Sequence, residues 1–473
     1  MPFDSLREFI EHLDKMGEVH YIDAPVDKDW EVGAICRENF DHLGPALIFR
    51  NITGYKTPLV VGVLATKRRY AAALGLPPDH RAIMERWKQA YKNPIKPKIV
   101  QKAPCQEVEL DAVDLYAEPF PVPLWHPGDG GPFLGTFHGM VTKDPETGWI
   151  NMGNYRNQIL EKDKLGCLVI PYRHDGLHWR RWKEMGKPMP VAIVVGMEPY
   201  LNMVSVAAVP AQVDEYDIAG GLKGEPIELA PCKTVDLLVP ANADIIIEGE
   251  MPTDHFYPHE APFGEFPGYM GLKRRESQYI IVKKITHRRE PLFQGTLEGM
   301  PPNESTESRV YARSASLYEH LVNRAGIPGI IDVCCTAAGC AGFHTVVSMR
   351  KLYPGHTRDV MGHVWGHPTL FSKHVTIVDE DIDPWDPFMV EWSIATRVQA
   401  GRDVVIVRDG KSILLDPSQV PSKRGLSDLM GIDATRPVED YAREGHEFIP
   451  PAGPPGELVA KARARWREYG FIS

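Results

Sequence analysis

The sequence predicts an α+β protein made of three consecutive parts. Its 473 residues exceed what one ordinary hydrophobic core accommodates, and 43% apolar with 25% charged residues is the usual globular balance. Helix and strand patterns alternate at the start and again in the last third, whereas short strand patterns punctuated by proline and glycine fill the middle. We therefore expect an α/β domain at residues 1–110, a β-rich domain at 111–302 and a second α/β domain at 303–473.

The first domain is expected to open with an amphipathic helix. Ser5 and Glu8 have the spacing of a capping box, apolar residues follow at helical spacing, and Gly17 ends the pattern. Strands are predicted at 46–49 and 59–64, helices at 67–74 and 80–91, and a proline-containing linker at 93–98.

The middle domain is expected to be a barrel or a sandwich rather than a parallel sheet, because its strands are short and interrupted by proline and glycine. A D-P-E-T-G turn between two apolar runs predicts a β-hairpin. The strands are expected at 140–142, 149–152, 191–195, 236–239, 245–248 and 279–285. An ordered loop from Pro119 to Pro132 lies inside this domain, where such loops often carry function.

The last domain returns to alternating helices and strands. Helices are predicted at 307–325, 357–365 and 387–398, and strands at 329–333, 345–349, 374–378 and 403–407. A charged, amphipathic terminal helix is expected at 457–469, docked either on its own domain or on a partner subunit.

Charge and composition exclude several classes of protein. The net charge of -10 disfavours a nucleic-acid or anionic-membrane partner, and no run of about 18 apolar residues could span a membrane. The charged N-terminal segment does not resemble a secretion signal, and seven cysteines, an odd number, fit a reducing cytoplasm. Cys334, Cys335 and Cys340 lack zinc-site spacing, so we expect buried thiols.

Two carboxylates lie in a Pro/Gly-rich segment with the sequence P-H-E-A-P-F-G-E-F-P-G-Y. Glu260 and Glu265 flank its Pro-Phe-Gly turn, in which Gly264 permits backbone conformations that other residues resist. Each acid is close to an aromatic residue, Phe263 or Phe266, and apolar surroundings raise the pKa of a carboxyl. Such acids suit proton transfer near neutral pH. The alternative is a surface loop with solvated acids.

Three further segments carry polar residues suited to chemistry. In N-M-G-N-Y-R, Asn151 offers a neutral oxygen, Gly153 allows close backbone approach, and Arg156 offers a planar fork for a carboxylate. R-H-D-G contributes a cation and the His174 imidazole at a turn, and V-D-E-Y-D contributes Glu215. Read individually, these are also compatible with a surface arginine, a solvated histidine and an ordinary acid. Walker, G-x-S-x-G and H-E-x-x-H motifs do not occur.

In order and spacing, N-M-G-N-Y-R, R-H-x-G, V-D-E-Y and E-x-P-F-G-E-x-x-G-Y resemble the UbiD decarboxylase family, over nearly the whole chain. The resemblance implies a central split β-barrel that carries a flavin and a C-terminal α/β oligomerisation domain, in a homodimer or homohexamer. It also implies prenylated FMN made by a separate flavin prenyltransferase, with Mn²⁺ and usually K⁺ at its phosphate.

The same resemblance implies roles for individual residues. Asn151, His174 and Glu215 resemble manganese ligands, a set of hard oxygens plus one imidazole that suits Mn²⁺. Arg156, Glu260 and Glu265 resemble the catalytic trio. The implied cofactor-binding residues are Met152, Gly153, Asn154, Tyr155, Arg156, Arg173, His174, Ser205, Glu215 and Lys373. His367 is an alternative to Lys373 near the phosphate, and Arg173 stands where some relatives carry glutamine. A separate metal site at His255 and His259 is a further alternative.

The activity implied is reversible, non-oxidative decarboxylation of an aromatic, heteroaromatic or α,β-unsaturated acid through a covalent adduct with the prenylated flavin. Arg156 would orient the substrate carboxylate and keep Glu260 ionised, and Glu265 would donate the proton that replaces CO₂. A metal-dependent hydrolase that uses the same acids without flavin is the main alternative, and a flavin-storage protein is another.

Overall fold

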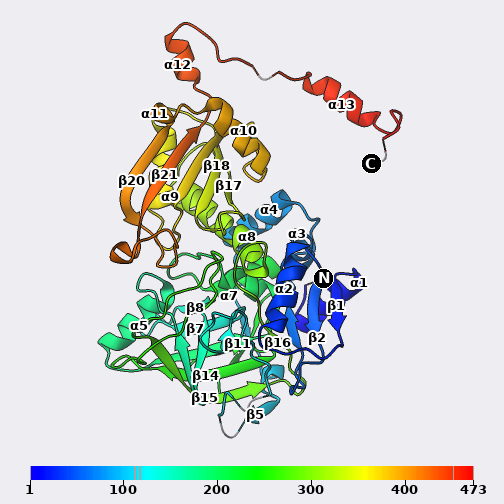
Figure 1. Cartoon of the computed structure of the whole chain (residues 1–473), viewed down its shortest axis with the longest axis vertical. Helices are drawn as coiled ribbons and strands as arrows, with labels where there is room; N and C mark the ends of the chain where they lie inside the picture. Colours follow the sequence, from blue (N-terminus) through cyan, green and yellow to red (C-terminus); the bar gives the residue numbers. More distant parts are fainter. Residues whose placement is uncertain (1, 111–112, 117–118, 451, 472–473) are drawn as a thin grey trace.

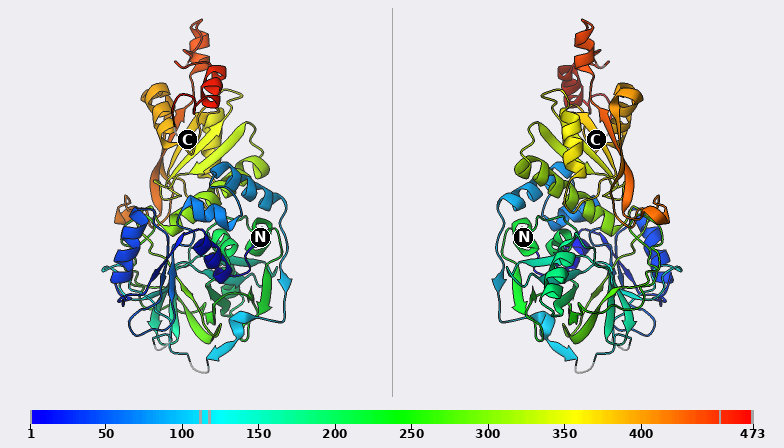
Figure 2. Two further views of the ribbon diagram at one scale, coloured as in Figure 1. Left: turned by 90° about the vertical axis from the view of Figure 1, so that its right-hand side faces the viewer. Right: turned by 90° about the vertical axis from the view of Figure 1, so that its left-hand side faces the viewer.

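The computed structural model describes residues 2–110, 113–116, 119–450 and 452–471. The N-terminal and central domains lie side by side, and the C-terminal domain stands on them, with α8 (Glu304–Glu319) at the junction (Figure 1). Side views show the C-terminal domain as a narrower upper lobe (Figure 2). None of the helices in the described part of the chain combines the length and apolar composition that a bilayer crossing requires.

The N-terminal domain is built on a four-stranded sheet in the order β1-β2-β3-β16. The predicted first helix is confirmed as α1: the Ser5 side chain accepts a hydrogen bond from the Glu8 amide, and four apolar residues of the helix are buried. The predicted strand at 59–64 ends earlier, because Gly62 turns the chain with φ 85°. The elements are α1 (Leu6–Lys15), β1 (Val19–Ile22), α2 (Glu31–Asp41), β2 (Ala46–Phe49), β3 (Leu59–Val61), α3 (Lys67–Ala73) and α4 (His80–Lys92).

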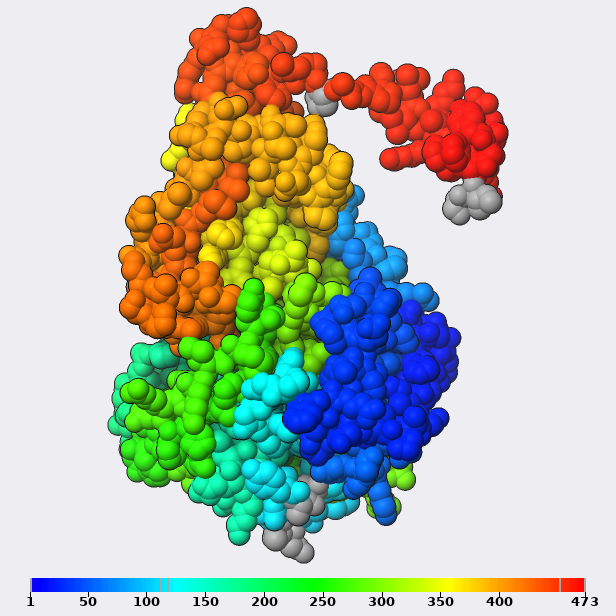
Figure 3. Space-filling model, in the orientation of Figure 1, coloured from blue at the N-terminus to red at the C-terminus, as the bar shows by residue number. Residues whose placement is uncertain are grey.

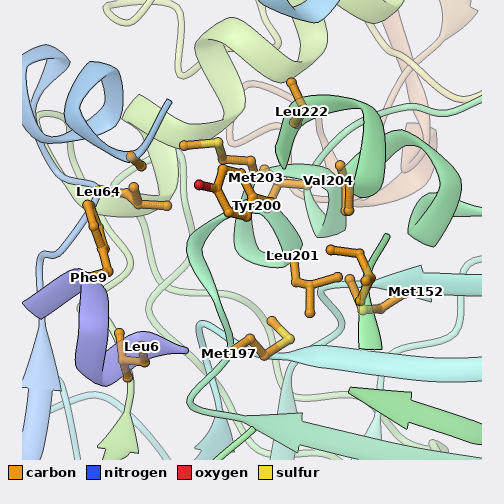
Figure 4. Packing of buried hydrophobic residues seen from close by; sticks show 14 of the residues in the cluster. Leu6, Phe9, Leu64, Met152, Met197, Tyr200, Leu201, Met203, Val204 and Leu222 are labelled. Atoms are coloured by element: carbon orange, nitrogen blue, oxygen red, sulfur yellow. The ribbon is translucent and has the colours of Figure 1, made fainter. Parts of the chain in front are cut away.

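Strand β16 (Phe293–Gln294) comes from much later in the chain, yet it pairs in parallel with β3. Conversely, β5 (Val108–Leu110) pairs with β15 (Gln278–His287) of the central sheet. The N-terminal and central domains also share one hydrophobic core. Figure 4 shows Phe9 and Leu64 of the first domain beside Tyr200 of the second. These two domains are therefore joined by pairing and packing as well as by the chain.

The central domain is a nine-stranded antiparallel sheet that curls into an open half-barrel, as the short strands predict. Its main path is β6-β9-β10-β15-β14-β11-β7-β8, and the predicted hairpin is confirmed as β7 paired with β8. The strands are β6 (Phe133–Gly135), β7 (Gly139–Lys143), β8 (Ile150–Gly153), β9 (Asn157–Glu161), β10 (Lys164–Cys167), β11 (Met189–Val195), β14 (Ile245–Met251) and β15.

Three helices of the central domain were not predicted from the sequence: α5 (His174–Glu184), α6 (Pro199–Ser205) and α7 (Glu215–Lys223). The predicted strand at 236–239 is shorter and later than expected, β13 (Leu238–Pro240). It forms a small sheet with β12 (Glu228–Pro231) and β4 (Lys98–Ile99).

The C-terminal domain contains a five-stranded sheet in the order β17-β18-β19-β21-β20, with its three inner strands parallel. The strands are β17 (Ile330–Cys335), β18 (His344–Met349), β19 (His374–Asp379), β20 (Val404–Lys411) and β21 (Leu426–Ala434). The helices are α8, a π-helical turn (His320–Arg324), α9 (His356–Trp365), α10 (Pro387–Arg397), α11 (Ala400–Asp403), α12 (Val438–Arg443) and α13 (Gly456–Ala464).

The terminal helix does not dock on its own domain. Helix α13 is shorter than predicted and contains no buried residue, and it stands away from the rest of the protein (Figures 1 and 3). Exposed apolar side chains lie on this segment, among them Leu458 and Trp466.

Candidate active site

A cavity lies between the half-barrel and the C-terminal domain, and the space there not filled by protein atoms, including the open solvent at its mouth, is about 1080 Å³. Its walls come from the turn after β8, the starts of α5 and α7, and the loop that carries Glu260 and Glu265. Helix α8 and two segments of the C-terminal domain complete them. The lining includes residues from all four sequence segments singled out above: Asn151, Met152, Gly153, Asn154, Tyr155, Arg156, Arg173, His174, Glu215, Phe263, Glu265 and Phe266.

Arg156 joins the two glutamates predicted to act with it. Its Nε donates to Glu260 Oε1 at 2.9 Å, and its Nη1 donates to Glu265 Oε1. The Glu260 side chain is fully buried, and those of Arg156 and Glu265 are each 10% exposed. The readings as a surface arginine and a solvated acidic loop are therefore wrong. One guanidinium, with fixed donor directions, sets the separation of both carboxylates.

The loop that carries the glutamates is a narrow antiparallel ribbon. Glu260 and Arg274 exchange backbone hydrogen bonds of 3.2 and 3.0 Å, and the Glu265 amide donates to the Tyr269 carbonyl at 2.9 Å. Gly264 is needed for a reason other than the expected one. Its φ is not positive, but a Cβ at this position would overlap the His126 ring. Close packing, rather than unusual backbone conformation, requires this glycine.

Burial and the ion pairs together set the pKa values of Glu265 and Arg156. Removal from water raises the pKa of Glu265, Arg156 opposes this increase, and the nearby Glu298 and Glu260 add to it. Burial alone would lower the pKa of Arg156, but Glu265 and Glu260 together hold it above its ordinary value. Arg156 therefore remains charged, while Glu265 holds its proton more strongly than an exposed glutamate does.

The three residues expected to bind manganese lie at another part of the cavity wall. Asn151 is on β8, Glu215 is the first residue of α7, and His174 is the first residue of α5 rather than part of a turn as expected. His174 Nδ1 lies 3.6 Å from Glu215 Oε1, and Glu215 Oε2 accepts from the Met152 amide at 3.0 Å. The helix starts thus aim an imidazole and a carboxylate at the end of β8.

The chemistry of this set fits a hard metal ion. All three side chains are buried and line one cavity, and they provide two oxygens and a nitrogen. Among the residues that the structure describes, no three His, Cys, Asp or Glu side chains form a metal-binding group. The expected manganese set contains one His and one Glu, and its third member, Asn151, offers an amide oxygen. The alternative metal site at His255 and His259 gains no support from the described residues.

The backbone at the end of β8 is held in place by close packing and by a backbone hydrogen bond to α6. Gly153 has room only for a hydrogen, because a Cβ would overlap the ring of Tyr155. The Asn154 amide donates to the Ser205 carbonyl at 2.9 Å, which joins this segment to the end of α6. Ser205 and Arg173 also line the cavity, as expected.

Lys373 and His367 do not lie among the residues that line this cavity. Lys373 pairs with Asp416 at 3.1 Å and donates to Ser418 at 2.6 Å. His367 is buried against His320, and its Nδ1 accepts from two backbone amides. In this arrangement of the domains, neither residue lies at the cavity wall.

Sequence reasoning missed three charged residues that line the cavity: Glu298, Arg309 and Arg313. Glu298 follows the last strand of the N-terminal sheet, and the two arginines lie on α8. Their i, i+4 spacing on a predicted helix was a signal that they share one face.

A half-barrel and an α/β domain that meet at a cavity lined by buried carboxylates and arginines define a protein with a charged small-molecule site. Sequence models of 3-octaprenyl-4-hydroxybenzoate carboxy-lyase match the chain in three parts: the N-terminal domain at residues 10–87, the Rift-related domain at 98–301 and the C-terminal domain at 310–434. The chain belongs to the UbiD family, and it is a carboxy-lyase.

Solved structures agree with this assignment. The chain resembles the closed form of vanillic acid decarboxylase from Sedimentibacter hydroxybenzoicus, with 28% identity, 99% and 100% of the two chains covered, and a TM-score of 0.91. The UbiD-class enzyme HmfF from Pelotomaculum thermopropionicum, in complex with FMN, has 32% identity, 95% and 98% coverage and a TM-score of 0.81. A 3,4-dihydroxybenzoic acid decarboxylase from Enterobacter cloacae has 27% identity, 98% and 100% coverage and a TM-score of 0.81.

Proposed function

We propose that this enzyme catalyses the reversible, non-oxidative decarboxylation of an aromatic, heteroaromatic or α,β-unsaturated carboxylic acid with prenylated FMN as its cofactor. The observation that carries the proposal is the buried trio of Arg156, Glu260 and Glu265, of which Arg156 and Glu265 line the cavity. The FMN bound to HmfF and the acids named for the similar decarboxylases support it.

Decarboxylation leaves an electron pair on carbon, and no protein side chain accepts such a pair well. Prenylated FMN, when bound, would supply that electron sink through a covalent bond to the substrate. The residues that would hold it are Met152 to Arg156, Arg173 and Ser205, with Asn151, His174 and Glu215 binding Mn²⁺ at its phosphate. We also propose that K⁺ binds at the same phosphate, and this part of the proposal rests on the family resemblance alone.

The protein's own residues would orient the substrate and move one proton. The Arg156 guanidinium would position the substrate carboxylate, and its bond to Glu260 keeps the guanidinium plane fixed. When CO₂ leaves, the Glu265 carboxyl would deliver its proton to the substrate carbon that carried the CO₂. The raised pKa of Glu265 favours the protonated form that this step requires. Apolar side chains such as Phe263, Ile170 and Leu415 would limit access of water to this carbon.

The test is a comparison of wild-type protein with Glu265→Gln, both co-expressed with a flavin prenyltransferase. The wild type should show the visible spectrum of a bound flavin and release CO₂ from members of an aromatic acid panel. Glu265→Gln should keep that spectrum and lose turnover by several orders of magnitude, because the amide cannot donate the proton. Turnover at the wild-type rate would remove Glu265 from its role, and activity without flavin would favour the hydrolase alternative.

We further propose that the enzyme works in the cytoplasm as a homodimer or homohexamer. All seven cysteines are free thiols, which fits a reducing compartment. Two exposed features support self-association through the C-terminal domain. The edge strand β20 presents Ile406 at 63% exposure, and the projecting terminal segment presents Leu458 at 56%.

A further inference from the structure

Arg313 on α8 is a buried cation that lacks a carboxylate partner. The residue is 7% exposed, and among the described side chains no acid pairs with it. Its Nη1 donates to the Ala341 carbonyl at 3.0 Å, which uses one of the five N–H donors of the guanidinium. An unpaired charge inside a protein is unfavourable, so a site that retains one is suited to bind an anion.

The neighbours of Arg313 do not neutralise it. The guanidinium lies 5.0 Å from the Phe371 ring centroid and 6.0 Å from that of Phe266, and these faces attract a cation weakly. Arg309, one helical turn earlier, is already satisfied, because it pairs with Glu298 at 3.0 Å. Of these two arginines on α8, only Arg313 has charge left for a ligand.

Arg313 lies beside the loop that carries Glu265, and Arg173, a candidate cofactor residue, lies near enough to lower its pKa. Arg313 lines the cavity and lies beside Phe266, the residue that follows Glu265 directly. The candidate phosphate and metal residues, Asn151 and Glu215, belong to β8 and α7 on the half-barrel side. A guanidinium presents parallel donors that match the two oxygens of a carboxylate.

We propose that Arg313 forms a second anion subsite, and that the substrate is an aromatic acid with a second carboxylate. Arg156 would receive the carboxylate that leaves, and Arg313 would receive the one that stays. This inference rests on the proposed function for the identity of the first carboxylate. The second subsite would make the enzyme prefer aromatic dicarboxylates to monocarboxylates, a selectivity that the catalytic trio by itself does not provide.

The experiment measures binding of benzoate, isophthalate and terephthalate to flavin-loaded enzyme by calorimetry, so that no turnover is needed. The wild type should bind one of the two dicarboxylates at least tenfold more tightly than benzoate. Arg313→Gln should abolish that preference and leave benzoate binding within twofold. Arg50→Gln is the matched control, since Arg50 pairs with Asp23 on the surface of the N-terminal domain and should keep the preference.

Three results would overturn the subsite: no dicarboxylate preference in the wild type, equal loss of benzoate and dicarboxylate binding in Arg313→Gln, or loss of flavin absorbance in that variant. The last result would assign Arg313 to the cofactor instead. If Arg313→Gln does not fold, Arg313→Lys keeps the charge without the fork and should show a reduced preference; an unchanged preference would contradict the proposal. Release of CO₂ from any aromatic acid, measured separately, tests the proposed function, so the two can fail independently.

Discussion

Removing the Arg156 guanidinium should destabilise the protein even before cofactor binds. Arg156→Gln leaves two buried carboxylates without their shared cation: Glu260, which is fully buried, and Glu265, which is nearly so. Breaking a buried ion pair by removing one partner typically costs about 3–5 kcal/mol, because the remaining charge is uncompensated. Arg274 Nη1 lies 3.6 Å from Glu260 and offsets part of this loss. We therefore expect the effect to come mainly from Glu265.

The assay is denaturant unfolding of the cofactor-free protein, followed by circular dichroism at pH 5 and pH 8. The loss should be smaller at pH 5, since the orphaned Glu265 carboxyl, whose pKa burial raises, can then bind a proton. Combining Arg156→Gln with Glu265→Gln removes the orphaned charge and should recover about 2 kcal/mol. Arg50→Gln, which breaks an exposed ion pair, is the control and should change the midpoint little. Equal midpoints for Arg156→Gln and wild type at pH 8 would refute the argument.

Three further predictions concern the metal site, a buried acid and the loop. Glu215→Ala should lose bound flavin and Mn²⁺, measured by absorbance and metal analysis; retention of both would contradict the metal assignment. Burial raises the pKa of Glu304 to about 7 from 4.5, so its stabilising contribution is complete below about pH 4.5 and is lost as the pH rises through 7. Over this window the contribution of Glu304 to the free energy of unfolding changes by about 3 kcal/mol. The melting temperature of Glu304→Gln should therefore depend less on pH between pH 5 and pH 8 than that of the wild type. An unchanged slope would remove Glu304 as its source. Gly264→Ala should displace the loop from the His126 ring and lower kcat/KM about a hundredfold with flavin retained. The control is Gly401→Ala, whose added methyl group meets open space, and it should leave kcat/KM unchanged. Wild-type activity of Gly264→Ala would show that the loop can adjust to the added methyl group.

The sequence predicts which side chains meet at the site better than it predicts their local structure. Short motifs specify Arg156, Glu260 and Glu265 because few residue types can orient a carboxylate or donate a proton. Helix α5, by contrast, has the sequence HDGLHWRRWKE, in which charged and aromatic residues hide any apolar period. His174 was therefore expected in a turn, although it starts a helix.

Burial of charge was also beyond the reach of the sequence. An arginine on a helix is normally exposed, so the pattern of α8 did not distinguish Arg313 from a surface residue. Strand β16 has two residues, too few for any periodic signal, and its pairing with β3 is a long-range event. Features set by short stretches of sequence could be predicted. Features that depend on contacts between distant segments, such as the burial of Arg313 and the pairing of β16 with β3, could not.

The pairing of β3 with β16 has a consequence for synthesis of the protein. Until residue 294 has emerged from the ribosome, the outer edge of β3 has no partner, although most of the first domain is already available to fold. An open strand edge invites pairing with other nascent chains. We expect fragments that end before residue 290 to aggregate, so the first domain matures only together with the second.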